Sequence, residues 1–75
     1  MIVVDTSAVV AVLFDEPGAE GILDVLGSER CAMTSATLVE LAIVVEARTG
    51  AAGSQLLEGL IERADIEILP VDGRL

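Results

Sequence analysis

The chain contains no histidine, no lysine, no tryptophan and no tyrosine, and it has only one cysteine and one phenylalanine among its 75 residues. Without histidine, Ser/His/Asp and Cys/His catalysis are impossible within the chain, and so is a histidine-ligated zinc site. The single Cys31 cannot form an internal disulfide, which agrees with a reducing, cytoplasmic compartment, and we expect it to fill the core. Any chemistry carried by these residues must therefore use carboxylates or hydroxyls.

Positive charge is also scarce, because 4 arginines face 13 aspartates and glutamates, for a net charge of −9. A surface that holds nucleic acid by neutralising phosphates is basic, so the charge of this chain has the wrong sign for that mode of binding. If the substrate is a nucleic acid, metal ions must bridge the carboxylates to its phosphates. A basic protein is the other natural partner.

Apolar residues are abundant, but the longest apolar run, from Ile2 to Phe14, is interrupted by Asp5. A membrane span needs about 20 apolar residues, so we expect no membrane segment. The apolar fraction of 53% also exceeds that of a disordered acidic tail. The sequence therefore predicts one small folded unit, or part of one.

The hydrophobic pattern predicts strands at 2–4, 31–33 and 66–71, and helices at 8–14, 19–26, 38–47 and 56–64. Inner stripes of Ala19, Ile22, Leu23 and Leu26, and of Leu56, Leu57, Leu60, Ile61 and Ala64, mark the second and fourth helices. The third helix is apolar nearly all round, so we expect several neighbours to cover it, and Arg48 near its end is interpreted as an ordinary surface charge. This alternation predicts an α/β fold, with helices packed on a parallel sheet.

Asp5 stands at the carboxyl end of the first predicted strand, which is where open α/β sheets place their ligands. Thr6 and Ser7 can cap a helix that begins at Ala8, and Asp5 can itself serve as the cap. Position alone leaves a functional and a capping role for Asp5 open.

Glu40 is the second unusual carboxylate, because its helical neighbours include Ile43, Val44 and Ala47. A carboxylate in such an apolar stripe is expected to be buried, and it then needs a partner, a proton or a metal. The alternative is a capping box in which Glu40 bonds back to the amide of Thr37. Glu46, on another side of the same helix, is expected to face solvent or a subunit interface.

Four segments of the chain together resemble the opening half of a PIN-domain ribonuclease, and the likeness is greatest to VapC-type toxins of bacterial toxin–antitoxin pairs. The segments are Ile2-Val3-Val4-Asp5-Thr6-Ser7-Ala8, Asp15-Glu16-Pro17, Ser35-Ala36-Thr37-Leu38-Val39-Glu40 and Glu46-Ala47-Arg48. The resemblance implies that Asp5 is a metal ligand and that Glu40 belongs to the same catalytic acidic cluster. It also implies that Thr6 and Ser7 line the substrate site or orient the carboxylates.

The resemblance implies that the protein is a metal-dependent endoribonuclease. It also implies that a cognate VapB-type antitoxin neutralises the enzyme and that the protein forms a homodimer. The expected cofactor is Mg²⁺ or Mn²⁺, which prefers hard oxygen ligands and can activate a bound water to attack a phosphodiester. Whether one or two ions act stays open.

The chain departs from the family in length, since a complete PIN domain is nearly twice as long and carries further acidic ligands beyond the third strand. We therefore interpret residues 1–75 as the N-terminal part of one PIN-like domain, without its C-terminal part and inactive alone. The family's strand order would then leave 2–4 as an exposed apolar edge. The alternative is a non-catalytic interaction fragment that binds an antitoxin or completes a split domain with a complementary C-terminal fragment. A haloacid dehalogenase-like phosphotransferase is disfavoured, because Ser7 stands where that family has a second aspartate.

Overall fold

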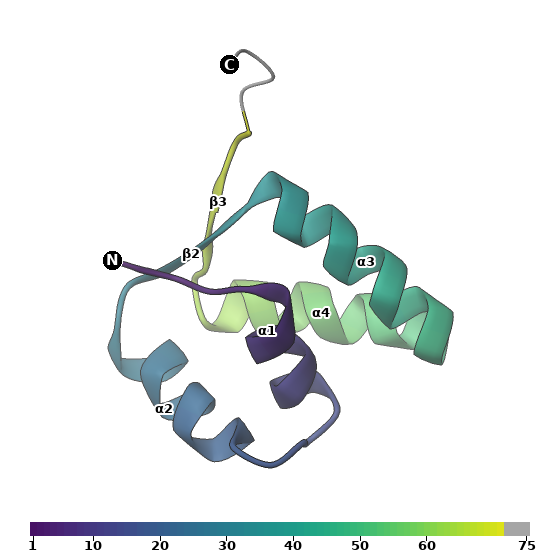
Figure 1. Cartoon of the computed structure of the whole chain (residues 1–75), viewed down its shortest axis with the longest axis horizontal. Coiled ribbons are helices and arrows are strands. Elements are labelled where there is room, and N and C mark those ends of the chain that lie inside the picture. Colours follow the sequence, from purple (N-terminus) through teal and green to yellow (C-terminus); the bar gives the residue numbers. More distant parts are fainter. Residues whose placement is uncertain (72–75) are drawn as a thin grey trace.

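The computed structural model of the chain describes residues 1–71, in which strands and helices alternate as the sequence predicts (Figure 1). The elements are β1 (Ile2–Val3), α1 (Thr6–Leu13), α2 (Ala19–Ser28), β2 (Cys31–Thr34), α3 (Ser35–Thr49), α4 (Ala51–Arg63) and β3 (Glu67–Leu69). The prediction of an α/β fold with a parallel sheet, three strands and four helices is confirmed.

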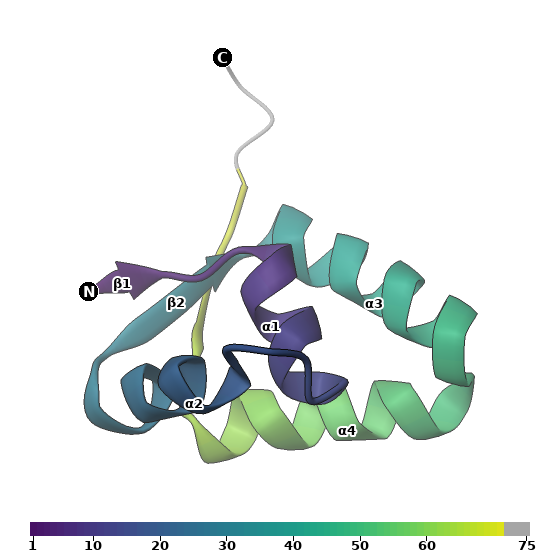
Figure 2. The same ribbon diagram turned by 60° about the horizontal axis from the view of Figure 1, so that its bottom comes forward.

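The three strands form one parallel sheet in the order β1-β2-β3. Ile2 pairs with Cys31 and Val3 with Ala32, while the next amide, that of Val4, donates to the Ala32 carbonyl at 2.8 Å. Helices α1, α2 and α4 lie on the same side of this sheet (Figure 2). Strand β2 therefore has a strand on each side and helices against one face.

The core lies between β2 and the helices, and Met33, Leu41, Val9 and Val45 are among its fully buried side chains. Cys31 is also buried, as expected of a core-filling residue. Met33 and Cys31 are two positions apart on β2, so both project toward the same face, the one that the helices cover. Burial of these side chains holds the helices to the sheet.

The starts of α1 and α3 differ from the sequence prediction, because each helix is capped by an earlier residue. Asp5 has an extended backbone and accepts a hydrogen bond from the Ala8 amide at 3.0 Å, so α1 begins at Thr6. Thr34 accepts from the Thr37 amide at 3.1 Å, so α3 begins at Ser35. Several residues near each helix start could cap it, and in both helices the residue directly before the first helical residue takes the role.

The inner stripes of α2 and α4 are only partly as predicted, since Leu23 is 47% exposed and Leu56 is 60% exposed. Leu57, which is buried, lies about 100° around α4 from Leu56. The neighbours of α4 cover one part of its apolar surface, and Leu56 falls outside that part. Placing these two leucines in the core was therefore wrong.

Strand β1 lies at the edge of the sheet, and its side chains are exposed, with Val3 at 61%. The expectation of an exposed apolar edge at 2–4 is thus confirmed for β1, although Val4, just after it, is buried. A row of unpaired backbone groups beside apolar side chains is a surface that favours pairing with a further strand.

Helices α3 and α4 approach closely where Gly53 meets the last turn of α3. A methyl group at Gly53 would overlap Oγ1 of Thr49 and come within 2.6 Å of Cγ1 of Val45. The Thr49 hydroxyl is itself fixed by donation to the Val45 carbonyl at 2.8 Å. Glycine at position 53 thus sets how near α4 comes to α3.

We expect Gly53→Ala and Gly59→Ala, two identical substitutions in α4, to change stability in opposite directions. Gly53→Ala should lower the free energy of unfolding by about 1–3 kcal/mol because it overpacks the contact with α3. Gly59 has no atom within 4 Å of an added methyl, so alanine there should stabilise the helix by up to about 1 kcal/mol. Urea denaturation of the intact protein measures both values, and a Gly53→Ala variant as stable as Gly59→Ala would contradict the packing described here.

Candidate functional site

The candidate site lies at the edge of the sheet where β1 and β2 end. Because the two strands are parallel neighbours, their carboxyl ends lie side by side, and α1 and α3 both begin there (Figures 1 and 2). Asp5 links β1 to α1, and Glu40 follows in the second turn of α3. Two segments distant in the sequence thus contribute a carboxylate each near one edge of the sheet.

Asp5 is held in place by two hydrogen bonds to the same carboxylate oxygen. The Ala8 amide and the Ser7 hydroxyl each donate to Oδ1 at 3.0 Å. The bond from the Ala8 amide, and after it the bond from the Ser7 hydroxyl, lowers the pKa of the exposed Asp5 carboxyl below its ordinary value. Within residues 1–71, Oδ2 accepts no hydrogen bond, so this oxygen is available to a ligand.

The hydroxyls of Ser7 and Thr6 differ in their relation to Asp5. Ser7 is exposed and bonded to the carboxylate, so the structure brings these two residues together. Thr6 is half-buried at the start of α1, and its side chain forms no hydrogen bond among the described residues. Ser7 is therefore the hydroxyl that orients Asp5.

Glu40 is exposed, so the expectation that it would be buried was wrong. The buried face of α3 is formed by Leu41 and Val45, whereas Ile43, one of the apolar neighbours of Glu40, is 65% exposed. The alternative capping box is also absent, because Thr34 caps the helix and Thr37 lies within its first turn. Glu46 is exposed, as expected.

A side-chain contact joins the far ends of α1 and α3. The Arg48 guanidinium lies 3.9 Å from the centre of the Phe14 ring, and its Nη1 is 3.8 Å from Oε2 of Glu16. The expectation of an ordinary surface charge missed this contact. The signal available in the sequence was Phe14 itself, which is the only aromatic residue and therefore the only ring that an arginine of this chain could contact in a cation–π interaction.

The contact between Arg48 and Phe14 helps to locate Glu40 relative to α1, the helix that Asp5 caps. Glu40 is within about 80° of Arg48 around α3, so both lie on the half of the helix that faces α1. Counted back from the Phe14 contact at about 1.5 Å per residue, Asp5 and Glu40 both lie roughly 12–14 Å toward the sheet. Both carboxylates thus belong to the ends of α1 and α3 that lie nearer the sheet.

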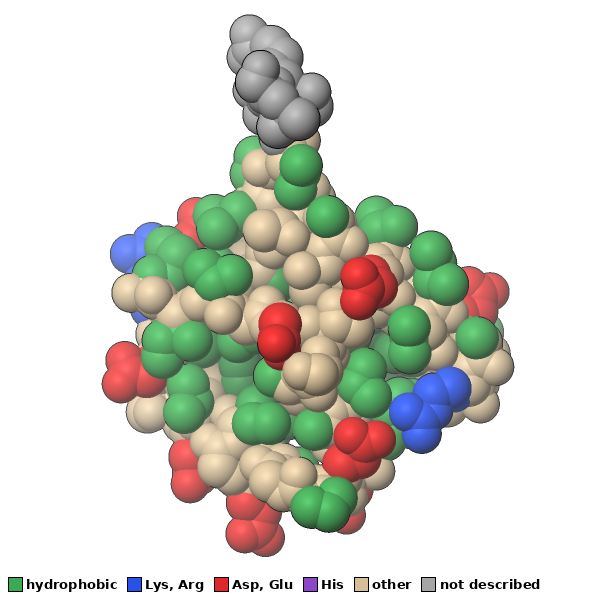
Figure 3. Space-filling model, in the orientation of Figure 1, with side chains coloured by type: hydrophobic (Ala, Val, Ile, Leu, Met, Phe, Trp, Pro, Cys, Tyr) green, Lys and Arg blue, Asp and Glu red, His purple; other side chains and the backbone are tan. Residues whose placement is uncertain are grey.

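The donor set at this edge is two exposed carboxylates and the Ser7 hydroxyl. Acidic side chains lie near the middle of the face in Figure 3, over the starts of α1 and α3. Hard oxygen donors of this kind suit Mg²⁺, which one or two carboxylates can hold together with water. No cluster of three or more acidic, histidine or cysteine side chains suited to a metal occurs in the part of the chain that the structure describes. The residues present thus fit a weakly held, largely hydrated ion.

Comparison with known proteins gives a consistent result over almost the entire chain. Residues 2–75 match the PIN domain family. The chain is 39% identical to Ribonuclease VapC of Mycolicibacterium smegmatis over 71 residues, and this matched region covers 93% of this chain and 55% of that protein. It is 39% identical over 70 residues to Ribonuclease VapC30 of Mycobacterium tuberculosis, covering 92% and 53%. To Ribonuclease VapC28 of the same organism it is 34% identical over 73 residues, covering 96% and 55%. The chain spans about half the length of these curated relatives.

Removing the Ser7 hydroxyl should raise the pKa of Asp5 part of the way toward its ordinary value of 3.8, because the Ala8 amide bond remains. A carboxyl whose pKa is lowered by folding stabilises the folded state above pH 3.8 and loses that contribution as the pH falls through the lowered value. Ser7→Ala should therefore be less stable than the unmodified protein at pH values above 3.8, and this difference should shrink as the pH falls through the lowered value. A pH titration of the Asp5 carboxyl carbon by NMR measures the shift.

The control for this titration is Ser28→Ala, since the Ser28 hydroxyl donates to the Asp24 carbonyl and does not contact Asp5. An Asp5 pKa that is equal in Ser7→Ala and in the unmodified protein would show that Ser7 does not orient this carboxylate.

Proposed function

This chain belongs to the PIN domain family, and from that membership we propose that the protein is a metal-dependent endoribonuclease toxin of the VapC type. The observation that carries the proposal is the 39% identity to a ribonuclease VapC over 93% of the chain. The carboxylates at the shared edge of β1 and β2 support it, because they provide hard oxygen donors at the ligand-binding edge of an α/β sheet. The proposed reaction is the hydrolysis of RNA phosphodiester bonds.

In this proposal, Asp5 and Glu40 are the catalytic acidic residues and would hold Mg²⁺ or Mn²⁺. Asp5 is suited to the role because its carboxyl is ionised at neutral pH, as an ordinary exposed aspartate is, and because its Oδ2 is free of hydrogen bonds among residues 1–71. When bound, a divalent ion supplies an activated water and neutralises charge. Ser7 fixes the orientation of Asp5, and Thr6 and Ser7 line the substrate site. A chain with a net charge of −9 needs such neutralisation to accept an anionic strand.

We propose that residues 1–75 are the N-terminal part of a single PIN domain. The curated relatives extend well beyond the matched region, and the open edge of β1 offers a place for a further strand. Two carboxylates make a sparse metal site, so efficient hydrolysis requires acidic ligands from outside these residues. The 75 residues alone would then be inactive.

The second candidate function is a non-catalytic interaction fragment that binds an antitoxin or completes a split domain with a complementary C-terminal fragment. The absence of a cluster of three or more metal-binding side chains in residues 1–71 favours it. The two candidates differ in whether the intact protein cleaves RNA, where the intact protein means residues 1–75 together with the proposed C-terminal part of the domain.

The partners in this proposal are an RNA substrate, a cognate VapB-type antitoxin and a second copy of the protein. Val39 and Ile43, which leave part of α3 apolar and exposed, support the homodimer. None of the helices within residues 1–71 has both the length and the apolar character needed to cross a bilayer. Our proposal places the protein in the cytoplasm.

Asp5→Asn and Glu40→Gln should each reduce RNA cleavage by the intact protein at least about 100-fold. Changes to groups that merely support metal ligands already cost about 10–100-fold, and a direct ligand should cost at least as much. Asparagine caps helices as well as aspartate does, so Asp5→Asn preserves the start of α1 and removes only the charge. Cleavage of a labelled RNA in Mg²⁺ or Mn²⁺ measures the loss.

The matched control is Glu46→Gln, which removes an exposed carboxylate from the same helix and should leave cleavage unchanged. Full activity in either Asp5→Asn or Glu40→Gln would remove that residue from the site. No cleavage by the unmodified intact protein would favour the interaction fragment.

A further inference from the structure

Thr37, in the first turn of α3, carries a hydroxyl proton that no described residue accepts. Thr34 Oγ1 accepts a hydrogen bond from the Thr37 amide and donates its own proton to Thr37 Oγ1, both at 3.1 Å. Thr37 Oγ1 is therefore the acceptor in this pair of hydroxyls, and within residues 1–71 it donates to no other group. A hydroxyl carries one donor, so the proton of this half-buried side chain is available to a ligand.

The register of the sheet places Thr34 next to Asp5. Val3 pairs with Ala32, and Asp5 and Thr34 each stand two residues further along their strands with an extended backbone. Neighbouring strands lie about 4.7–4.9 Å apart, so the two residues leave the sheet side by side. The hydroxyl pair formed by Thr34 and Thr37 thus lies at the edge that carries Asp5.

The direction of Thr37 around α3 also points to that edge. Thr37 is about 20° from Arg48 around the helix, and Arg48 is the residue that contacts Phe14 of α1. Thr37 therefore lies on the side of α3 that faces α1, at the end where Asp5 caps α1. Glu40 is about 60° away from Thr37 on the next turn, so the hydroxyl lies between the two carboxylates of the candidate site.

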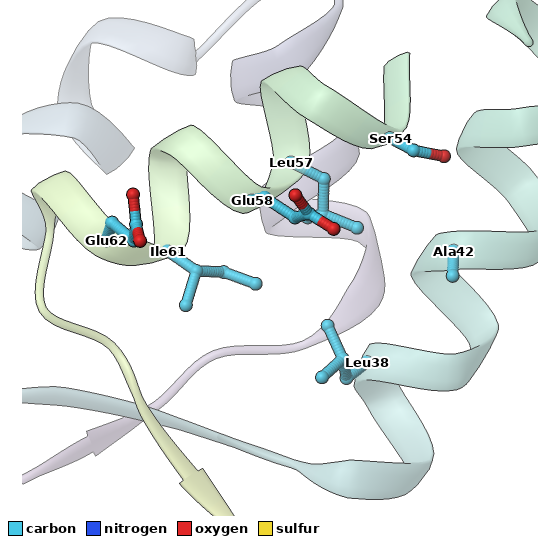
Figure 4. Close-up of a pocket in the computed structure, with 7 residues that line it drawn as sticks. All are labelled: Leu38, Ala42, Ser54, Leu57, Glu58, Ile61 and Glu62. Carbon is cyan, nitrogen blue, oxygen red and sulfur yellow. The ribbon is translucent and has the colours of Figure 1, made fainter. Parts of the chain in front are cut away.

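The opposite side of α3 borders α4, and Leu38 and Ala42 line a groove between these two helices (Figure 4). Ser35 is about 20° from Ala42 around α3, so it lies on this other side. Its Oγ accepts a hydrogen bond from the Val71 amide at 3.0 Å, which joins the start of α3 to the segment after β3. Thr37 is thus the residue at the start of α3 whose free donor faces the candidate site.

An anionic strand needs hydrogen-bond donors, and the described residues offer few at this edge. Asp5 and Glu40 only accept hydrogen bonds when they are ionised, and the Ser7 hydroxyl already donates to Asp5. The arginines within residues 1–71 are paired or lie elsewhere: Arg30 with Glu67, Arg48 with Glu16, and Arg63 beside α2. A hydroxyl with a free proton is therefore the kind of group that this edge can offer to a phosphate.

We propose that Thr37 is a substrate-binding residue that donates its hydroxyl proton to a phosphate oxygen of an RNA strand bound at the Asp5 edge. Thr34 is a positioning residue, because its bond to Thr37 Oγ1 fixes that hydroxyl. This inference rests on the proposed function, in which RNA is the substrate, and it adds a residue from α3 to the hydroxyls of α1.

The test compares Thr37→Val with Thr37→Ser in the intact protein. Valine removes the hydroxyl but keeps the shape of the side chain and the amide that Thr34 caps. Fluorescence anisotropy measures affinity for a labelled single-stranded RNA of mixed sequence, with Ca²⁺ in place of Mg²⁺ because it also takes oxygen ligands. A gel confirms that the RNA stays intact. Thr37→Val should weaken binding at least about tenfold, since a hydrogen bond to a charged oxygen is lost, and Thr37→Ser should stay within about threefold.

The matched control is Thr49→Val, the same substitution at the other end of α3, where the hydroxyl donates to the Val45 carbonyl. This variant should bind RNA within about twofold of the unmodified protein. Equal RNA affinities of Thr37→Val and Thr49→Val would overturn the proposal, as would a lack of RNA binding by the unmodified protein. Mn²⁺ affinity, measured by electron paramagnetic resonance, should be unchanged in Thr37→Val. A parallel loss of Mn²⁺ affinity would also overturn the proposal, because the hydroxyl would then hold a metal ligand.

Cleavage of the same RNA in Mg²⁺ separates this inference from the proposed function. RNA that binds, and binds more weakly to Thr37→Val, but is never cleaved would support the Thr37 contact and reject the nuclease. Cleavage by the unmodified protein together with unchanged RNA affinity in Thr37→Val would leave the nuclease in place and reject the Thr37 contact.

Discussion

The parallel pairing of β1 with β2 is the constraint on which the rest of the molecule depends. It aligns Ile2 with Cys31 and Val3 with Ala32, and this register places the ends of both strands at one edge of the sheet. Two helices must then begin beside each other, because each strand is followed by its helix after at most two residues. A shift of this register by one residue would turn the buried side chains of β2 to the other face of the sheet. The pairing therefore determines both the core and the position of Asp5 relative to α3.

Helix α3 separates two surfaces of different character. One side faces α1 and carries Glu40, while the other borders α4 and the groove between them. Between these sides, Leu41 and Val45 fix the helix to the core. Because the core holds α3 firmly, a metal bound by the carboxylates of the proposed site would meet a preformed surface. The two surfaces can therefore be altered independently by substitution.

The sequence alone predicts the order of elements, the parallel sheet and the place of Asp5, because β-branched runs, helix periods and strand-end polar residues each carry a local signal. It does not predict that Glu40 is exposed. The apolar residues near Glu40 on α3 indicate a face that could be buried, but whether another element covers that face depends on the packing of the folded chain. The exposure of Leu56 has the same cause. The contact of Arg48 with Phe14 and the close approach at Gly53 depend on how two helices meet, which no single segment encodes. The groove between α3 and α4 follows from that approach, so it too becomes visible only in the folded chain.

The central claim is that Asp5 and Glu40 share one divalent cation. A crystal of the intact protein grown with Mn²⁺ tests it directly, because anomalous scattering locates manganese without reference to any assumed site. The account predicts one peak within coordination distance, about 2.0–2.5 Å or one bridging water, of both carboxylates. Manganese bound elsewhere, with Asp5 and Glu40 facing separate solvent, would contradict it.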